Sequence, residues 1–431
     1  MNKEYLKGQI WKGRYDFVTK ISIITTWDKK DKDFYVPGAL IRVDNGRNVL
    51  SAKFSQEPEQ ATYCTLMFRD TPLFQFQGEE YFCPTCEKIV RSGYQLEQTE
   101  EFHIEKLNCE NVPFQEAVEE ITPLLGLLED NYYVVIDTEL YPTDGNGHLF
   151  WKVPNSDEPV RGSCLLYRGD GEWGLCRPHF TVATQSVEKL CESRVEYYRK
   201  HPDCRAVTYY MDGYMTALLD GHHKAMAAAL EHRKVKALVI MPGMIHHYRH
   251  EDGSFKTYIV AGDMRFACDE YGVKAVPTNM GEKITFQEMQ GIQKLIPDAG
   301  SSFPYDNDEL ASYYPTADEV AFIDDIGEIS EERLDQIVQE IHICERDEIC
   351  TLIRALGGLR HKRLFEMSDF FLKRCSYLSG TGYYDPEMFR IILEELMKLP
   401  RSGELEMYLI DIMVEYEDEY PTVGKMILEY L

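Results

Sequence analysis

Residues 206–230 read AVTYYMDGYMTALLDGHHKAMAAAL and predict a β-hairpin that runs directly into a helix. Two runs of apolar and β-branched residues, AVTYY and MTALL, flank Asp212-Gly213, a dipeptide typical of tight hairpin turns. The turn DGHHK follows the second run, and small residues behind it, to about residue 232, favour a closely packed helix. The segment KALVI, residues 236–240, is the next expected strand.

A further helix is expected ahead of this hairpin. Ser186 is a suitable N-cap residue. Five apolar side chains recur behind it at helical spacing: Val187, Leu190, Cys191, Val195 and Tyr198. The order helix, hairpin, helix, strand predicts a central α/β domain, which we place at residues 181–300.

The turn DGHHK has the composition of an anion-binding site. The N–H groups and the dipole of a helix's first turn attract phosphate, and glycine lets a ligand approach the backbone. The candidate ligand-binding residues are Gly221, His222, His223 and Lys224, and the candidate catalytic residues are Asp220 and His222. In the alternative interpretation, Asp220 caps the helix, both histidines form local hydrogen bonds, and no ligand binds.

This order of elements, with a turn of the form [D/G]-G-x-H-[R/K], resembles the ParB/sulfiredoxin superfamily over about residues 185–245. The superfamily includes chromosome-partitioning CTPases, sulfiredoxins and a free serine kinase that uses ADP or ATP. The resemblance places Gly221, His223 and Lys224 on the positions that contact nucleotide phosphates. It implies a nucleoside di- or triphosphate with Mg²⁺, or another phosphorylated small molecule, and either phosphotransfer to a small substrate or nucleotide hydrolysis.

Departures from the family pattern narrow the implied activity. Sulfiredoxin-like members carry their reactive cysteine directly before the histidine, where this chain has His222, so sulfinic acid reduction is excluded. Lys224 replaces the usual arginine, which keeps the charge but loses the bidentate geometry. The Gly-Glu-Arg-Arg box and helix-turn-helix of partitioning proteins are absent from the sequence. Magnesium would also need a carboxylate. The candidates are Asp220, Glu188, Glu192 and Glu196.

The first 180 residues are rich in predicted strands. Runs such as KISIITTW, GALIRV and YYVVIDTEL are β-branched and aromatic, and Gly, Asp and Pro separate them. One helix is expected at about residues 113–129. We treat residues 1–180 as a β-rich N-terminal region.

The segment YFCPTCEKIV contains a candidate zinc knuckle. A Cys-Pro-x-Cys turn directs the thiolates of Cys83 and Cys86 toward one tetrahedral metal ion, which predicts a structural zinc site. Two more ligands are needed, and His103 and Cys109 are the candidates, with Cys64 as an alternative. A redox role is less well supported, because no thioredoxin-like βαβ pattern surrounds the pair.

A histidine cluster, IHHYRH, follows the KALVI segment. His246 and His250 are four residues apart and would share a metal ion on a helix. A third hypothesis is therefore a metal hydrolase that uses this cluster, including His247, with His222 and His223. The flanking segments MPGM and EDGS instead favour a loop or short strand with exposed or substrate-facing histidines.

An acidic helical region closes the chain. The segment at about residues 297–316 is rich in Pro, Ser, Gly and Asp, and predicts a linker. Residues 317–431 have helical periodicity throughout, which suggests a short HEAT-like solenoid, although no sharp repeat signature fixes the period. In the helix that starts at Asp385-Pro386, Glu395 alone interrupts the apolar stripe.

The composition predicts a folded cytoplasmic protein. Of the 431 residues, 44% are hydrophobic, and neither a long uncharged apolar stretch nor a signal-peptide core is present, so membrane association is not expected. The formal net charge is −27, and residues 301–431 carry 29 Asp and Glu against 12 Lys and Arg. Such a surface repels a phosphate backbone, which argues against nucleic acid binding. The 12 cysteines show no regular framework, so reduced thiols are expected.

We therefore expect an α+β protein in three parts: a β-rich region with a zinc knuckle, a ParB/sulfiredoxin-like α/β domain, and a HEAT-like helical domain at residues 317–431. The favoured function is nucleotide or phosphate binding at the DGHHK turn, with phosphotransfer or nucleotide hydrolysis as its activity. The alternative is a non-catalytic interaction protein whose acidic helical repeat binds basic protein partners.

Overall fold

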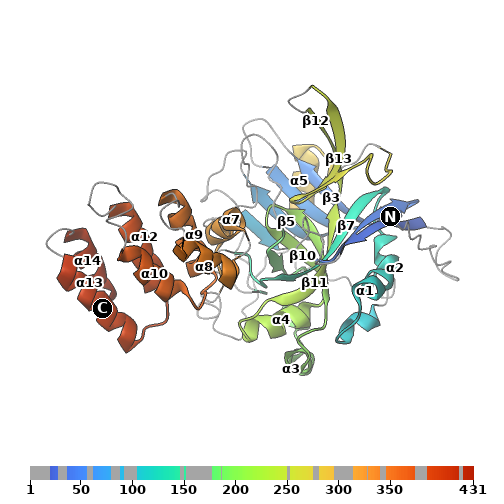
Figure 1. Cartoon of the computed structure of the whole chain (residues 1–431). Helices are drawn as coiled ribbons and strands as arrows, with labels where there is room; N and C mark the ends of the chain where they lie inside the picture. The colour runs from blue at the N-terminus through green and yellow to red at the C-terminus, as the bar shows by residue number, and fades with distance from the viewer. Residues whose placement is uncertain are drawn as a thin grey trace. The chain divides into compact units, whose positions relative to one another are not determined.

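The computed structural model divides into two compact units, Met1–Tyr314 and Pro315–Leu431 (Figure 1). The division falls at the end of the linker expected from the sequence. Sheets and helices are both present, which confirms the α+β class. The structure describes residues 20–27, 36–55, 62–78, 88–91, 104–145, 150–151, 177–185, 187–249, 253–274, 281–295, 314–327, 329–339, 346–373, 386–416 and 421–431.

A seven-stranded mixed sheet forms the centre of the N-terminal unit (Figure 1), in the order β1-β2-β7-β11-β9-β10-β8. The pairs β11–β9 and β10–β8 are parallel, and the other neighbours are antiparallel. The central strands β7 and β11 are buried along most of their length, as their continuous apolar sequences predict. The strands are β1 (Lys20–Trp27), β2 (Gly38–Asp44), β7 (Asn131–Leu140), β8 (Phe180–Val182), β9 (Ala206–Asp212), β10 (Met215–Asp220) and β11 (Val235–Pro242).

This sheet continues across the boundary that the sequence suggests at residue 180. β7 pairs with β2 on one side. On its other side it pairs with β11 in an unbroken register, from Leu140 opposite Val235 to Tyr133 opposite Pro242. The described parts of residues 1–180 and 181–300 therefore share one hydrogen-bonded sheet. Sequence periodicity identifies such strands, but it does not tell which strands pair.

Two smaller sheets contain the remaining strands of this unit in the described ranges. The five-stranded sheet has the order β15 (Glu282–Lys283), β3 (Leu50–Ser55), β4 (Thr62–Phe68), β5 (Thr71–Gly78) and β6 (Lys88–Arg91). The three-stranded sheet has the order β12 (Met244–Arg249), β13 (Phe255–Ala261) and β14 (Met264–Ala267).

Two of the expected helices differ from the sequence prediction. The helix at residues 113–129 is divided in two, with Pro123 in the first turn of the second helix, where its missing N–H costs little. The helix predicted behind Ser186 begins later, at Glu192, because Cys191 is extended. Ser186 itself lies outside the described residues. The helices are α1 (Phe114–Glu120), α2 (Thr122–Leu125), α3 (Glu192–Lys200), α4 (His222–Leu230) and α5 (Phe286–Gln293), with 3₁₀ turns η2 (Glu105–Asn108) and η3 (Val187–Lys189).

The C-terminal unit is a row of helices around one hydrophobic core (Figure 1). Its described part is entirely helical, as the sequence predicts, and the HEAT-like repeat stays a prediction. None of the helices in the described ranges has the length and apolar character needed to cross a lipid bilayer. The helices are α7 (Ala317–Ile326), α8 (Glu331–Gln339), α9 (Arg346–Gly358), α10 (Leu364–Leu372), α12 (Pro386–Met397), α13 (Gly403–Tyr416) and α14 (Pro421–Tyr430).

Two glycines at the end of α9 let three helices of this unit approach closely. A Cβ on Gly358 would lie 2.8 Å from the Cβ of Glu319 on α7, and a Cβ on Gly357 would lie 2.0 Å from Oε2 of Glu395 on α12. Lys398 bridges the two carboxylates, with its Nζ 2.9 Å from Glu319 and 3.0 Å from Glu395. Burial raises the pKa of Glu395, and the nearby Lys398 opposes that rise. The glutamate that interrupts the apolar stripe in the sequence is thus buried and paired with the half-exposed Lys398.

We expect Gly358→Ala to lower the free energy of unfolding of the C-terminal unit by about 1–3 kcal/mol, because the new methyl group would overlap the Cβ of Glu319. A Cβ atom moves only with its backbone, so α7 would have to shift. Chemical denaturation of the full chain, followed by circular dichroism, measures the change.

The matched control is Gly403→Ala in the same unit, where nothing lies within 4 Å of the new Cβ. We expect this control to change the unfolding free energy by less than about 0.5 kcal/mol. Equal effects of the two substitutions would contradict the close packing of α9 on α7.

Candidate functional site

The DGHHK turn lies where β10 passes into α4. Gly221 has φ = 100° and ψ = 24°, a left-handed conformation that favours glycine. A Cβ at this position would lie 2.7 Å from the Cβ of Ala206 on β9. Glycine is therefore required both by the backbone conformation and by the close packing of the turn against the sheet.

His222 is buried behind the turn. Its Nε2 accepts a hydrogen bond of 3.1 Å from the backbone N–H of Thr184, and its ring stacks on Trp151 with centroids 6.1 Å apart. These contacts attach the start of α4 to the segment that follows β8. They give His222 a structural role, and they add no support for the expected catalytic role, because Nε2 is already bonded within the protein.

His223 joins the start of α4 to the start of α3. Its Nε2 accepts a hydrogen bond of 3.1 Å from the backbone N–H of Cys191, which only the neutral ring can do. The backbone oxygen of Lys189 lies 3.2 Å from the same nitrogen and would accept from the protonated ring. Burial is the main cause of a lowered His223 pKa, and the positive charge of Arg194 lowers it further.

Lys224 is also turned into the protein. Its side chain is 3% exposed. The ammonium group donates to the backbone oxygen of Arg205 at 2.7 Å and to Oδ2 of Asp220 at 3.3 Å. It also lies 5.5 Å from the centre of the Tyr198 ring, a cation–π contact. The Asp220–Lys224 ion pair therefore fastens the first turn of α4 to the end of β10.

The N-terminus of α4 has no side-chain cap among the described residues. Asp220, the cap of the alternative interpretation, faces Lys224 instead. The local hydrogen bonds of that interpretation are present, since both His222 and His223 accept from backbone N–H groups. The N-cap residue of α4, Gly221, thus contributes no side-chain cap to the helix start.

α3 begins beside the start of α4. Its N-cap residue is Cys191, whose protonated thiol makes no capping hydrogen bond in the described structure. The Ser193 hydroxyl and then the backbone N–H of Arg194 stabilise the thiolate, which lowers the Cys191 pKa. Such a shift is typical of cysteines at helix N-termini.

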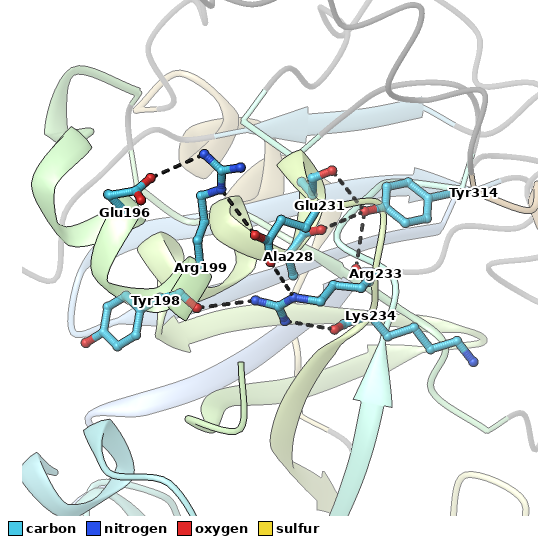
Figure 2. Close-up of polar contacts among 9 residues, drawn as sticks. Glu196, Tyr198, Arg199, Ala228, Glu231, Arg233, Lys234 and Tyr314 are labelled. Carbon is cyan, nitrogen blue, oxygen red and sulfur yellow. Dashed lines mark hydrogen bonds and ion pairs between the residues drawn. The ribbon is translucent and has the colours of Figure 1, made fainter. Parts of the chain in front are cut away.

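The C-terminal ends of the two helices are joined by polar contacts (Figure 2). Arg233 donates to the backbone oxygen of Tyr198 at 3.4 Å, and Nε of Arg199 lies 3.3 Å from Glu231. The Tyr314 hydroxyl lies 3.3–3.4 Å from carbonyl oxygens in the last turn of α4 and just after it, those of Ala228, Ala229 and Arg233. Burial raises the pKa of Tyr314, so its hydroxyl stays protonated and can donate. These ends are therefore capped by side chains.

α3 and α4 consequently lie side by side with the same polarity. The Cys191–His223 bond joins their starts, and the Tyr198–Arg233 bond joins their ends. Each helix N-terminus carries about half a positive charge, so two such partial charges lie at one end of the pair. Arg194, exposed in the first turn of α3, adds a full positive charge there. Chemically, this end of the pair is suited to an anion.

The carboxylates that the sequence offers as magnesium ligands differ in their exposure and in their ion-pair partners. Glu196 forms ion pairs with Arg199 and Lys200 on its own helix. Glu192 is exposed in the first turn of α3. Asp220, 37% exposed, is the carboxylate that directly precedes the turn.

The zinc prediction falls largely outside the described residues, which do not include Cys83, Cys86 or His103. Cys109 is exposed at the end of η2, and Cys64 is half-buried on β4. In the parts of the chain that the structure describes, no three His, Cys, Asp or Glu side chains are grouped to hold a metal ion. The zinc knuckle therefore stays a prediction.

The histidine cluster lies on an exposed strand. His246 and His247 are neighbours on β12 and so project to opposite faces, and Nδ1 of His247 lies 2.9 Å from Oγ1 of Thr257 on β13. His250 lies outside the described residues. The metal-sharing hypothesis requires these histidines to lie on one face of a helix. His246 and His247 lie on a strand instead.

Helical periodicity did not identify two residues of the candidate site. It places Cys191 in an apolar stripe, whereas Cys191 is the extended N-cap residue of α3. It also gives no reason to single out Arg194. The sequence signal was the run Cys-Glu-Ser-Arg, polar residues at a helix start, but its significance depends on the bond between Cys191 and His223, 32 positions apart.

In comparisons with protein-family models, curated proteins and solved structures, nothing matches this chain. The resemblance to the ParB/sulfiredoxin superfamily therefore depends on the short DGHHK motif and its flanking elements, and it stays a prediction.

The lowered pKa of His223 predicts a pH-dependent stability. The folded protein binds the His223 proton less tightly than the unfolded chain, whose pKa is near 6.5, so the unfolding free energy should fall as the pH drops below about 6.5. Denaturant unfolding between pH 7.5 and pH 5 should show a smaller decline in His223→Gln than in the wild type. The control is His232→Gln, an exposed position, which should retain the wild-type decline. A decline that is identical in all three proteins would contradict this role of His223.

Proposed function

We propose that the α3–α4 pair binds, at its N-terminal end, the phosphate of a nucleoside di- or triphosphate or of another phosphorylated small molecule. The observation that carries the proposal is the contrast between the two ends of the pair. Side chains join and cap the C-terminal ends, whereas the N-terminal ends meet without a side-chain cap in the described ranges. The resemblance to nucleotide-binding proteins, made from the sequence alone, supports the same ligand class.

The electrostatics of the pair favour a phosphate. Two helices of the same polarity place like partial charges together, and this repulsion is offset when an anion binds between the N-termini. Arg194 can supply charge-assisted hydrogen bonds to phosphate oxygens because its side chain is exposed. The ammonium of Lys224 is neutralised by Asp220, so it contributes mainly by holding the turn in place.

The binding proposal has a direct test in Arg194→Ala. In the presence of Mg²⁺, the unfolding temperature of the wild type should rise with at least one of ATP, ADP, CTP or GTP. At about 100 times its Kd, such a ligand should add roughly 2.7 kcal/mol to the free energy of unfolding. Arg194→Ala should weaken this shift, because it removes the full positive charge at the helix starts.

The matched control is Lys200→Ala, which removes one positive charge at the opposite end of the same helix and leaves the contacts to α4 in place, so it should keep the ligand-induced shift. Lys224→Ala is a poor probe, since it leaves the Arg205 carbonyl and Asp220 without their partner. The binding proposal is wrong if none of the nucleotides, inorganic phosphate or pyrophosphate raises the unfolding temperature, and the interaction-protein alternative then becomes the better account.

Turnover of the bound nucleotide is the second part of the proposal. Phosphoryl transfer and hydrolysis need Mg²⁺ held by a carboxylate, and Asp220 is the candidate. We expect Mg²⁺-dependent phosphate release by the wild type. Asp220→Asn, which keeps an oxygen that can accept from Lys224, should reduce it by on the order of 10²-fold. Glu196→Gln, which alters a carboxylate paired with Arg199 and Lys200, should release phosphate at the wild-type rate. Binding without phosphate release would restrict the site to a binding role.

A further inference from the structure

The helix α13 carries apolar side chains on two opposite sides. Its first apolar side contributes Leu405, Leu409 and Ile412 to the core of the C-terminal unit. On its other side lie Met407, Ile410 and Val414, here called the outer stripe. Met407 is 59% exposed and Val414 is 75% exposed, and Ile410 is half-buried.

The helical repeat places the outer stripe directly across the helix from the core. Residues advance by about 100° each, so Met407, Ile410 and Val414, spaced i, i+3 and i+7, share one face. A surface helix normally has one apolar stripe, and a helix that is apolar on two sides is typical of one that is covered on both. Figure 1 shows α13 and α14 at one end of the row of helices, where no further described helix of the unit follows.

The charge around the outer stripe indicates what would cover it. The helix α13 itself contains four Asp and Glu and no Lys or Arg. Asp411 is exposed and lies in the sequence between Ile410 and Val414. Glu404 and Glu415 are exposed near the two ends of α13. A second copy of the chain would bring the same acidic residues to the interface, and like charges across an interface are unfavourable. A basic partner would be attracted instead.

We propose that the outer stripe is the docking surface for a basic amphipathic helix of a partner protein. Apolar side chains of the partner at helical spacing would cover Met407, Ile410 and Val414, as in other helix-in-groove complexes. Lysine and arginine side chains on its flanks would pair with the surrounding carboxylates. This surface lies in the C-terminal unit and does not depend on the proposed phosphate site.

A designed peptide serves as the probe for this surface. The peptide has 18 residues of leucine and lysine, with leucines at i, i+3, i+4 and i+7 spacing, and carries a fluorescent label for anisotropy. We expect the full-length chain to bind it in a salt-dependent manner. A scrambled peptide of the same composition, and a version with glutamate in place of lysine, should bind at least tenfold more weakly.

The variant that tests the location is Met407→Ser with Val414→Ser. Both side chains are exposed, so the helical unit should stay folded, as circular dichroism would verify. We expect the Kd for the amphipathic peptide to rise at least tenfold. The matched control, Phe255→Ser, alters a 70% exposed apolar residue on β13 and should leave the Kd unchanged.

Three results would overturn the proposal. The first is no binding of the amphipathic peptide, and the second is equal binding of the scrambled peptide. The third is sedimentation showing that the wild type forms a dimer that the double variant does not form. In that last case the occupant of the outer stripe is a second copy of the chain.

Discussion

The shared polarity of α3 and α4 is the constraint on which the candidate site depends. The hydrogen bond from Cys191 to His223 fixes the two helix starts together, and the contacts of Arg233, Arg199 and Tyr314 fix the ends. Because the dipoles then point the same way, the positive ends of both helices lie together. An anion at that end would offset this repulsion, which is why we infer a phosphate ligand.

The buried polar residues of the DGHHK turn explain how this arrangement is held. A buried polar group is costly unless it is hydrogen-bonded. His222, His223 and Lys224 meet this requirement by bonding to backbone groups of Thr184, Cys191 and Arg205. Arg205 is in turn held by a bidentate ion pair with Asp137 on β7, with both N–O distances 2.8 Å. The strand β7 therefore supports the turn through Arg205, and the central sheet and the candidate site form one structural system.

Two positions of the C-terminal unit depart in opposite ways from the usual pattern of apolar residues inside and charged residues outside. In the C-terminal unit, Glu395 interrupts an apolar stripe, yet it is buried beside Gly357 and paired with Lys398. On α13 the situation is reversed, since Met407 and Val414 are apolar and exposed. The first departure is compensated within the unit by a charge of opposite sign. The second has no compensation in the described residues, and this difference led us to infer a partner for α13 alone.

Local sequence patterns are sufficient to predict the hairpin around Asp212-Gly213, the glycine turn into α4, the long apolar strands and the helices of the C-terminal unit. These follow from periodicity and turn chemistry, which act over a few residues. Which strands share a sheet, where α3 begins and which way His222, His223 and Lys224 point depend instead on long-range packing. The reason is physical, because strand pairing and buried hydrogen bonds join residues far apart in the chain. Sequence could therefore name the residues of the turn, but not the Cys191 and Arg194 partners that make it a candidate anion site.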